Sequence, residues 1–273
     1  MSVSHSLIYA NAPQIAPSLL DEIYALLAAY HGEERIRAII LRGSFARGDS
    51  TSYSDVDITC LVYDKPDTVK RFVYCQNRLI SMADKTLEKF RASLLAPEQA
   101  VFALTSLRED RILLDKDGTF QAFQQELVHF RWEPLQATAN EYASWHLMRV
   151  AEHAQKILSA FAKNDLLSGS SCVSILFMLL PDLIGVQRGI FLKSGEVYAR
   201  QVQEAVGLDS VWTYHHRMLA GLEGHADAEQ HGISALRLYQ ETARLLYSIL
   251  QPEHRTIVEQ VVQVIDVALA ERA

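Results

Sequence analysis

The chain has 273 residues, of which 49% are hydrophobic and 22% charged, so it can bury the core of one large domain or of two modest ones. Its formal net charge of -7 argues against general affinity for nucleic acid, where a basic surface is expected. The same charge is compatible with a cationic small-molecule substrate.

Membrane and cysteine features indicate an ordinary soluble protein. Residues 1–10 lack the basic stretch and long apolar core of a signal peptide, and the longest apolar stretch, 173–180, is shorter than a bilayer span. Cys60, Cys75 and Cys172 share no metal-like spacing, and the first two lie in apolar runs. We therefore expect buried free thiols, no membrane partner and a cytoplasmic location.

The first half of the chain mixes strand and helix patterns. Helical spacing begins at 19–30, and a short helix is expected after a Gly-Ser turn. Turn signals lie at 76–78 and 115–118. The expected strands are 36–41, 57–62, 71–75, 79–82 and 111–114, and further helices are expected at 85–95 and 98–107. Residues 1–133 thus predict a small α+β domain with a mixed sheet.

Beyond Pro134 the pattern changes to helical periodicity alone. Breaks are expected at 168–170, 207–209 and 251–252, where Gly, Ser, Asp or Pro interrupt the apolar spacing. The expected helices are 142–161, 173–191, 198–206, 233–250 and 257–269. Residues 134–273 therefore predict an all-helical bundle domain.

A Gly-Ser pair after the apolar run 39–41 is followed by an Asp-x-Asp that opens the next apolar run. Gly43 lets the backbone approach a ligand closely, and the Ser44 hydroxyl with nearby N–H groups can hold phosphate oxygens at a helix start. Asp55 and Asp57 are two residues apart on a strand, so both carboxylates project from one face. Two hard oxygen ligands beside a phosphate cradle suit Mg²⁺ bound to a nucleotide. The alternative is a Gly-rich turn beside a solvated acidic strand end.

The wording R-G-S-F-A-R-G at 42–48 with S-D-V-D-I at 54–58 closely resembles the signature of the nucleotidyltransferase superfamily related to DNA polymerase beta. It is similar to the antibiotic nucleotidyltransferases and to the minimal nucleotidyltransferase antitoxins. The motif-level likeness covers about 36–118, and the order of the two domains is similar to that of kanamycin- and lincosamide-type enzymes.

The resemblance implies an enzyme that transfers a nucleoside monophosphate to a hydroxyl of a small molecule. ATP is the first candidate among the nucleoside triphosphates, Mg²⁺ is the implied cofactor, and an antibiotic such as an aminoglycoside or lincosamide is the implied acceptor. Asp55 and Asp57 would hold the metal, Gly43 and Ser44 would fix the phosphates, and Arg47 would add charge nearby. A homodimer is also considered.

A third carboxylate, usual in this superfamily, is missing from the centre of the expected strand 78–84, where Ser81 stands. Asp84 at the strand end is the nearest substitute, although it could instead cap the following helix. Glu152, on a side of its helix rich in apolar residues, is the preferred acid from the helical domain, where a solvated helix face is the alternative. Arg188 and Lys193 could reach polyphosphate or could simply aid solubility.

Two other functions remain open at this point. One is a protein-modifying adenylyltransferase akin to the antitoxins, although those are usually much shorter chains. The other is a non-catalytic nucleotide-binding protein that kept the fold and lost its third acid. An intact Asp-x-Asp argues against the latter, because a binding relic has no need of both carboxylates.

Overall fold

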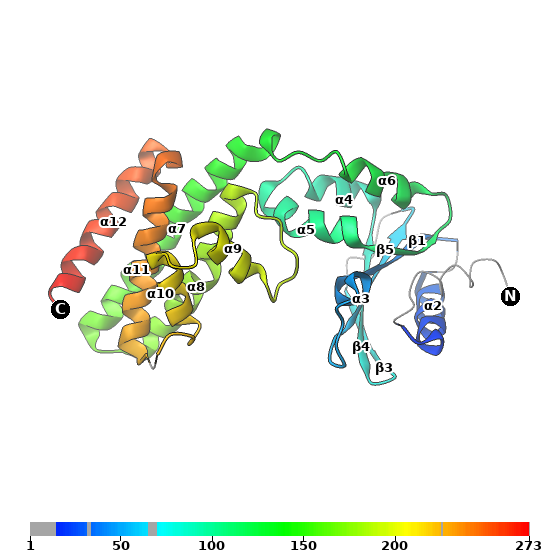
Figure 1. The fold of residues 1–273 in the computed structure, drawn as a ribbon, viewed down its shortest axis with the longest axis horizontal. Helices are drawn as coiled ribbons and strands as arrows, with labels where there is room; N and C mark the ends of the chain where they lie inside the picture. The colour runs from blue at the N-terminus through cyan, green and yellow to red at the C-terminus, as the bar shows by residue number, and fades with distance from the viewer. Residues whose placement is uncertain (1–14, 32–33, 65–69, 225, 273) are drawn as a thin grey trace. The chain divides into compact units, whose positions relative to one another are not determined.

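A computed structural model describes residues 15–31, 34–64, 70–224 and 226–272. By internal contacts the chain divides into two compact units, Met1–Arg131 and Trp132–Ala273. The first unit holds a sheet and the second is helical (Figure 1). The structure therefore confirms the predicted α+β class, with a mixed sheet followed by a helical part.

Five strands form the sheet of the first unit in the order β3-β4-β2-β1-β5. They are β1 (Ile36–Arg42), β2 (Val56–Val62), β3 (Arg71–Cys75), β4 (Arg78–Lys85) and β5 (Arg111–Asp115). The neighbours β2 and β4 are parallel, whereas the other pairs are antiparallel. The β3–β4 hairpin turns at Gln76 and Asn77, which both have positive φ, as a tight two-residue turn requires.

Helices cover both faces of this sheet (Figure 1). They are α2 (Pro17–His31), α3 (Gly43–Arg47), α4 (Leu87–Ser93), α5 (Pro97–Glu109) and α6 (Thr119–Leu127). Ile58 and Cys60 of β2 belong to one buried cluster with Leu20 and Ile23 of α2. Because side chains alternate along a strand, Asp57, Thr59 and Leu61 lie on the opposite face.

The face that carries Asp57 is the one covered by α4 and α5. Arg42 is the register partner of Asp57 and so shares its face. The Arg42 guanidinium lies over the Phe90 ring of α4 and donates to the Ser106 hydroxyl of α5. Farther along β2 on this face, Thr59 is fully buried. The two faces thus have different partners, which decides where each acidic side chain points.

Two boundaries in this unit differ from the sequence prediction. The strand β4 continues to Lys85, because the helix cap is the side chain of Thr86, which accepts from the Lys89 N–H. The helix α6 was not predicted, although Phe120, Phe123 and Leu127 recur at helical spacing and are buried. Its nine residues are too few for that spacing to stand out from the preceding turn.

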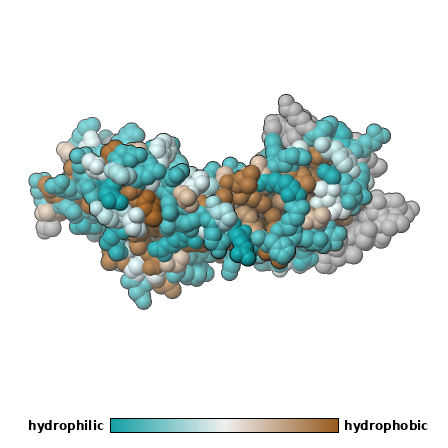
Figure 2. Space-filling model, turned by 90° about the horizontal axis from the view of Figure 1, so that it is seen from above, coloured by the Kyte–Doolittle hydropathy of each residue, from teal (hydrophilic) through white to brown (hydrophobic). Residues whose placement is uncertain are grey.

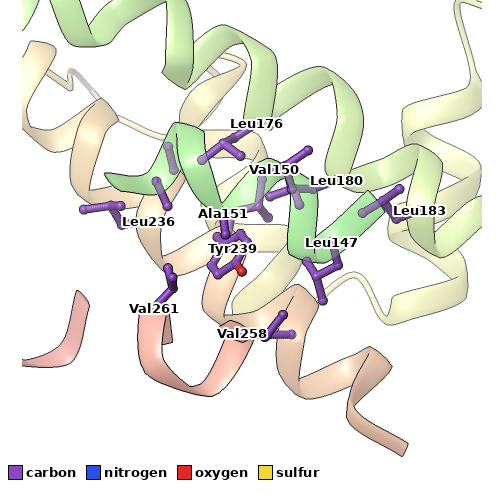
Figure 3. Close-up of a cluster of buried hydrophobic side chains, with 14 of the residues drawn as sticks. Leu147, Val150, Ala151, Leu176, Leu180, Leu183, Leu236, Tyr239, Val258 and Val261 are labelled. Atoms are coloured by element: carbon purple, nitrogen blue, oxygen red, sulfur yellow. The ribbon is translucent and has the colours of Figure 1, made fainter. Parts of the chain in front are cut away.

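In the part that the structure describes, the second unit consists of helices and the loops that connect them. Its elements are η1 (Glu133–Leu135), α7 (Gln136–Lys163), α8 (Leu166–Arg188), α9 (Tyr198–Val206), α10 (Val211–Leu219), α11 (Ala228–Leu246), η2 (Tyr247–Ile249) and α12 (Pro252–Ala270). Apolar side chains from α7, α8, α11 and α12 point toward one another around the buried Tyr239 (Figure 3). The expected helix 198–206 is reproduced at both ends.

The expected break at 168–170 is wrong, because these residues lie inside α8. A Cβ on Gly169 would lie 2.9 Å from the Cβ of Ala160, so this glycine allows α7 and α8 to approach closely.

The uninterrupted α8 is, by length and composition, long and apolar enough to cross a bilayer. Half of its most apolar window is buried inside the unit, with Leu176 and Leu180 in the core.

All three cysteines are free, as predicted, but they are not equally buried. Cys60 and Cys172 are buried, whereas Cys75 is only partly buried because β3 is an edge strand. Burial, followed by the charge of Asp84, raises the pKa of Cys60 to about 12.

On the face seen in Figure 2, hydrophilic residues predominate and separate smaller apolar patches.

Candidate functional site

The two halves of the sequence motif meet where β1 ends and β2 begins. β1 ends at Arg42, and Gly43 follows with φ +65° at the start of α3. A Cβ built on Gly43 would lie 2.8 Å from Oδ2 of Asp57. Only glycine leaves room for this approach, and only glycine adopts this backbone without strain. The Gly-Ser turn and the Asp-x-Asp therefore form one site.

Asp55 and Asp57 provide two carboxylates near the start of β2, beside the Gly-Ser turn. Asp55 stands one residue before β2, Asp57 is its second residue, and both are partly exposed. Within the described part of the chain, neither carboxylate has a hydrogen bond or an ion pair. Paired acidic groups without a cation suit a divalent metal with hard oxygen ligands. Among those same residues, no cluster of three or more His, Cys, Asp or Glu side chains is suited to a metal.

The place of a third carboxylate is occupied by Ser81. In the parallel β2–β4 ladder Ser81 is the register partner of Asp57, so the two side chains share a face. Asp84 pairs with Cys60 and lies on the opposite face, where its carboxylate is buried 3.6 Å from Arg71. The structure therefore corrects both interpretations of Asp84. It does not face the metal site, and it is not the helix cap.

Arg42, which the sequence analysis did not single out, directly precedes the Gly-Ser turn and bonds to residues of and next to α5. Its Nε donates to both carboxylate oxygens of Asp110, at 3.2 and 3.0 Å, and its Nη2 donates to Ser106. Burial raises the pKa of Asp110 to about 6, although the Arg42 charge opposes this shift. A basic residue directly before Gly43 was the available signal, but its acidic partner lies 68 positions away.

Comparison with known proteins bears directly on this unit. Residues 28–108 match the family model described as "Nucleotidyltransferase domain". The matched segment contains the Gly-Ser turn, the Asp-x-Asp and β4, so it supports nucleotidyl transfer as the general activity. No curated protein matches the chain.

One similar solved structure is a nucleotidyltransferase-like protein from Exiguobacterium sibiricum 255-15. It is 14% identical, with a TM-score of 0.46, and the likeness covers 92% of this chain and 87% of that one. At this level the likeness does not bear on the function of the present chain.

Within the segment that matches the family model, Ser44 and Arg47 lie on the short helix α3. The Ser44 carbonyl accepts from the Gly48 N–H and so closes the helix. The Nε of Arg47 is 3.0 Å from the Asp49 carboxylate, which offsets part of its charge. Arg47 thus lies beside the turn but is already paired, and its phosphate role stays a prediction.

Three predicted site residues belong to the second, helical unit. Glu152 is exposed and pairs with Lys156 at 2.6 Å, so it does not lie on an apolar side of α7 as expected. Arg188, the last residue of α8, donates to the carbonyl of Ala205 in α9, and Lys193 is exposed. Their roles toward base and polyphosphate stay predictions.

Proposed function

We propose that this protein transfers a nucleoside monophosphate, AMP from ATP in the first instance, to a hydroxyl of a small molecule. The single observation that carries the proposal is the contact between the glycine turn and the Asp-x-Asp. Gly43 has room for no side chain because the Asp57 carboxylate lies against it. That arrangement brings a phosphate-binding turn and a carboxylate pair to one point, as nucleotide binding with a divalent ion requires.

Each residue of the turn has a chemical role in this proposal. Asp55 and Asp57 would hold Mg²⁺, which when bound offsets the negative charge of the triphosphate. The backbone at Gly43 and the Ser44 hydroxyl would fix the phosphates that leave, and Arg47 would add positive charge nearby. The Arg42–Asp110 pair would keep the turn in place by joining the end of β1 to α5.

The reaction forms a bond between the acceptor oxygen and the α-phosphorus and breaks the bond from that phosphorus to the β-phosphate oxygen. Pyrophosphate leaves, and the acceptor proton passes to a base. Asp84 is excluded from this role because it lies on the opposite face of the sheet. Glu152 stays the proposed base, although the Lys156 ammonium holds the pKa of Glu152 below its usual value. Parallel kinetics of Glu152→Gln and wild type would test it.

A screen of ATP, GTP, CTP and UTP tests the function. Each is mixed with Mg²⁺ and pooled aminoglycosides and lincosamides, and pyrophosphate release is followed. We expect release with at least one pair and its loss in Asp57→Asn. A matched control is Asp64→Asn, which removes an exposed charge paired with Arg35 in the same unit. Nucleotide binding without release by any acceptor would favour the non-catalytic alternative.

A further inference from the structure

A pocket opens on the face of the sheet that carries Asp57. It is a cavity of about 300 Å³ between the end of β1, the end of β4 and the helices α4 and α5. Three cationic side chains line it, namely Arg42, Lys85 and Lys89, with Gln99 at its wall. Of the lining residues that the structure describes, none is acidic.

Only part of the positive charge of this pocket is matched by acidic groups of the described residues. Arg42 already has the Asp110 carboxylate. Lys85 is partly buried, and in the described residues its ammonium has no hydrogen bond or ion pair. Burial, followed by the like charges of Arg42 and Lys89, lowers the pKa of Lys85. An ammonium group in that setting gains from any anion that reaches it.

We propose that this pocket binds a phosphate-like anionic group at Lys85 and Lys89. Lysine binds phosphate as a compact point charge, and the Gln99 amide offers a further donor at the wall. A multiply charged anion suits two ammonium groups better than a single carboxylate does.

Lys85 lies at the end of the pocket away from Asp57, although Arg42, which also lines the pocket, directly precedes Gly43. Ser81, the partner of Asp57, is four residues before Lys85 on β4, which amounts to ~13 Å along the strand. The Gly43 turn lies at the Asp57 end of the sheet. Resting on the proposed function, the anionic group therefore belongs to the acceptor, so the acceptor is a hydroxyl compound that also carries a phosphate.

Titration of the whole protein with inorganic phosphate, by calorimetry at constant ionic strength, tests the pocket. We expect saturable binding that weakens at least 10-fold in Lys85→Gln and is largely kept in Lys85→Arg. Lys163→Gln, an exposed residue of α7, is the matched loss of one charge and should bind like wild type. Equal phosphate affinity in Lys85→Gln and wild type, or no phosphate binding in wild type, would overturn the proposal.

A second arm repeats the titration with saturating Mg²⁺ and a non-hydrolysable ATP analogue. Unchanged phosphate affinity supports an acceptor site, whereas competition would assign the pocket to the donor nucleotide and overturn the acceptor assignment. The two proposals fail separately. Phosphate binding needs no transfer, so it can hold when no nucleotide releases pyrophosphate, and transfer can occur when Lys85→Gln binds phosphate normally.

Discussion

Substituting Gly43 by alanine tests the contact between the turn and the Asp-x-Asp with an internal control. Gly43 and Gly118 have nearly the same φ, +65° and +70°. A Cβ on Gly43 would lie 2.8 Å from Oδ2 of Asp57, whereas a Cβ on Gly118 would meet nothing within 4 Å. Both variants therefore place a Cβ at a positive φ, and only Gly43→Ala also meets the Asp57 carboxylate.

The magnitude follows from these two terms. A left-handed conformation costs a residue with a Cβ about 1–2 kcal/mol, so both variants should lose that much free energy of unfolding. The 2.8 Å contact is relieved when the Asp57 carboxylate turns away by roughly 0.5 Å or more, since an ordinary contact needs ~3.4 Å. A displaced metal ligand should weaken binding of the Mg²⁺–ATP complex at least ~10-fold, or about 1.4 kcal/mol.

Urea unfolding and calorimetric titration with Mg²⁺ and a non-hydrolysable ATP analogue measure the two terms separately. We expect similar destabilisation of Gly43→Ala and Gly118→Ala, with nucleotide affinity lost only in the former. Equal nucleotide affinity in the two variants would refute the reasoning, because the clash would then have no effect on the site.

Three further predictions concern other parts of the molecule. Asp110→Ala removes the carboxylate that pairs with the partly exposed Arg42 guanidinium and should cost about 1–3 kcal/mol in urea unfolding; a loss below ~1 kcal/mol would contradict the anchoring role. Ser81→Asp places a carboxylate beside Asp57 and should tighten Mn²⁺ binding measured by calorimetry, and weaker binding would show that the position does not face the metal. Burial lowers the pKa of His216 to about 4, below its unfolded value of 6.5, so its contribution is complete above pH 6.5 and about 3 kcal/mol is lost as the pH falls to 4. His216→Phe should therefore flatten unfolding free energy against pH over that range, and an unchanged slope would assign the acid sensitivity to other groups.

The sheet and the helical unit could be predicted from the sequence because both follow from local periodicity. Apolar runs gave all five strands, and apolar spacing gave the longer helices. Failures occurred where a local signal had a tertiary meaning. Gly169 was taken as a helix break, but it is a contact point between α7 and α8. Local propensity cannot separate these cases, because the neighbour that decides between them is distant in the sequence.

The motif residues of the candidate site were predictable, whereas the groups around them were not. Asp84 was considered for the site because it follows the expected strand, but strand register places it with Cys60 on the other face. A shift of one residue reverses the face of a side chain, so proximity along the chain could not decide its role. The partners of Arg42 and Lys85 depend on how α4 and α5 pack, and no local pattern contains that information.

The position of β5 sets a lower limit on the piece of this protein that can fold alone. The family match ends at residue 108, but β1 pairs on one side with β5, Arg111–Asp115. A fragment cut at the end of the match would leave that edge of β1 open and would lack Asp110, the counter-ion of Arg42. Such a fragment should associate through its open edge, so the smallest piece that keeps the candidate site and a covered β1 extends past Asp115.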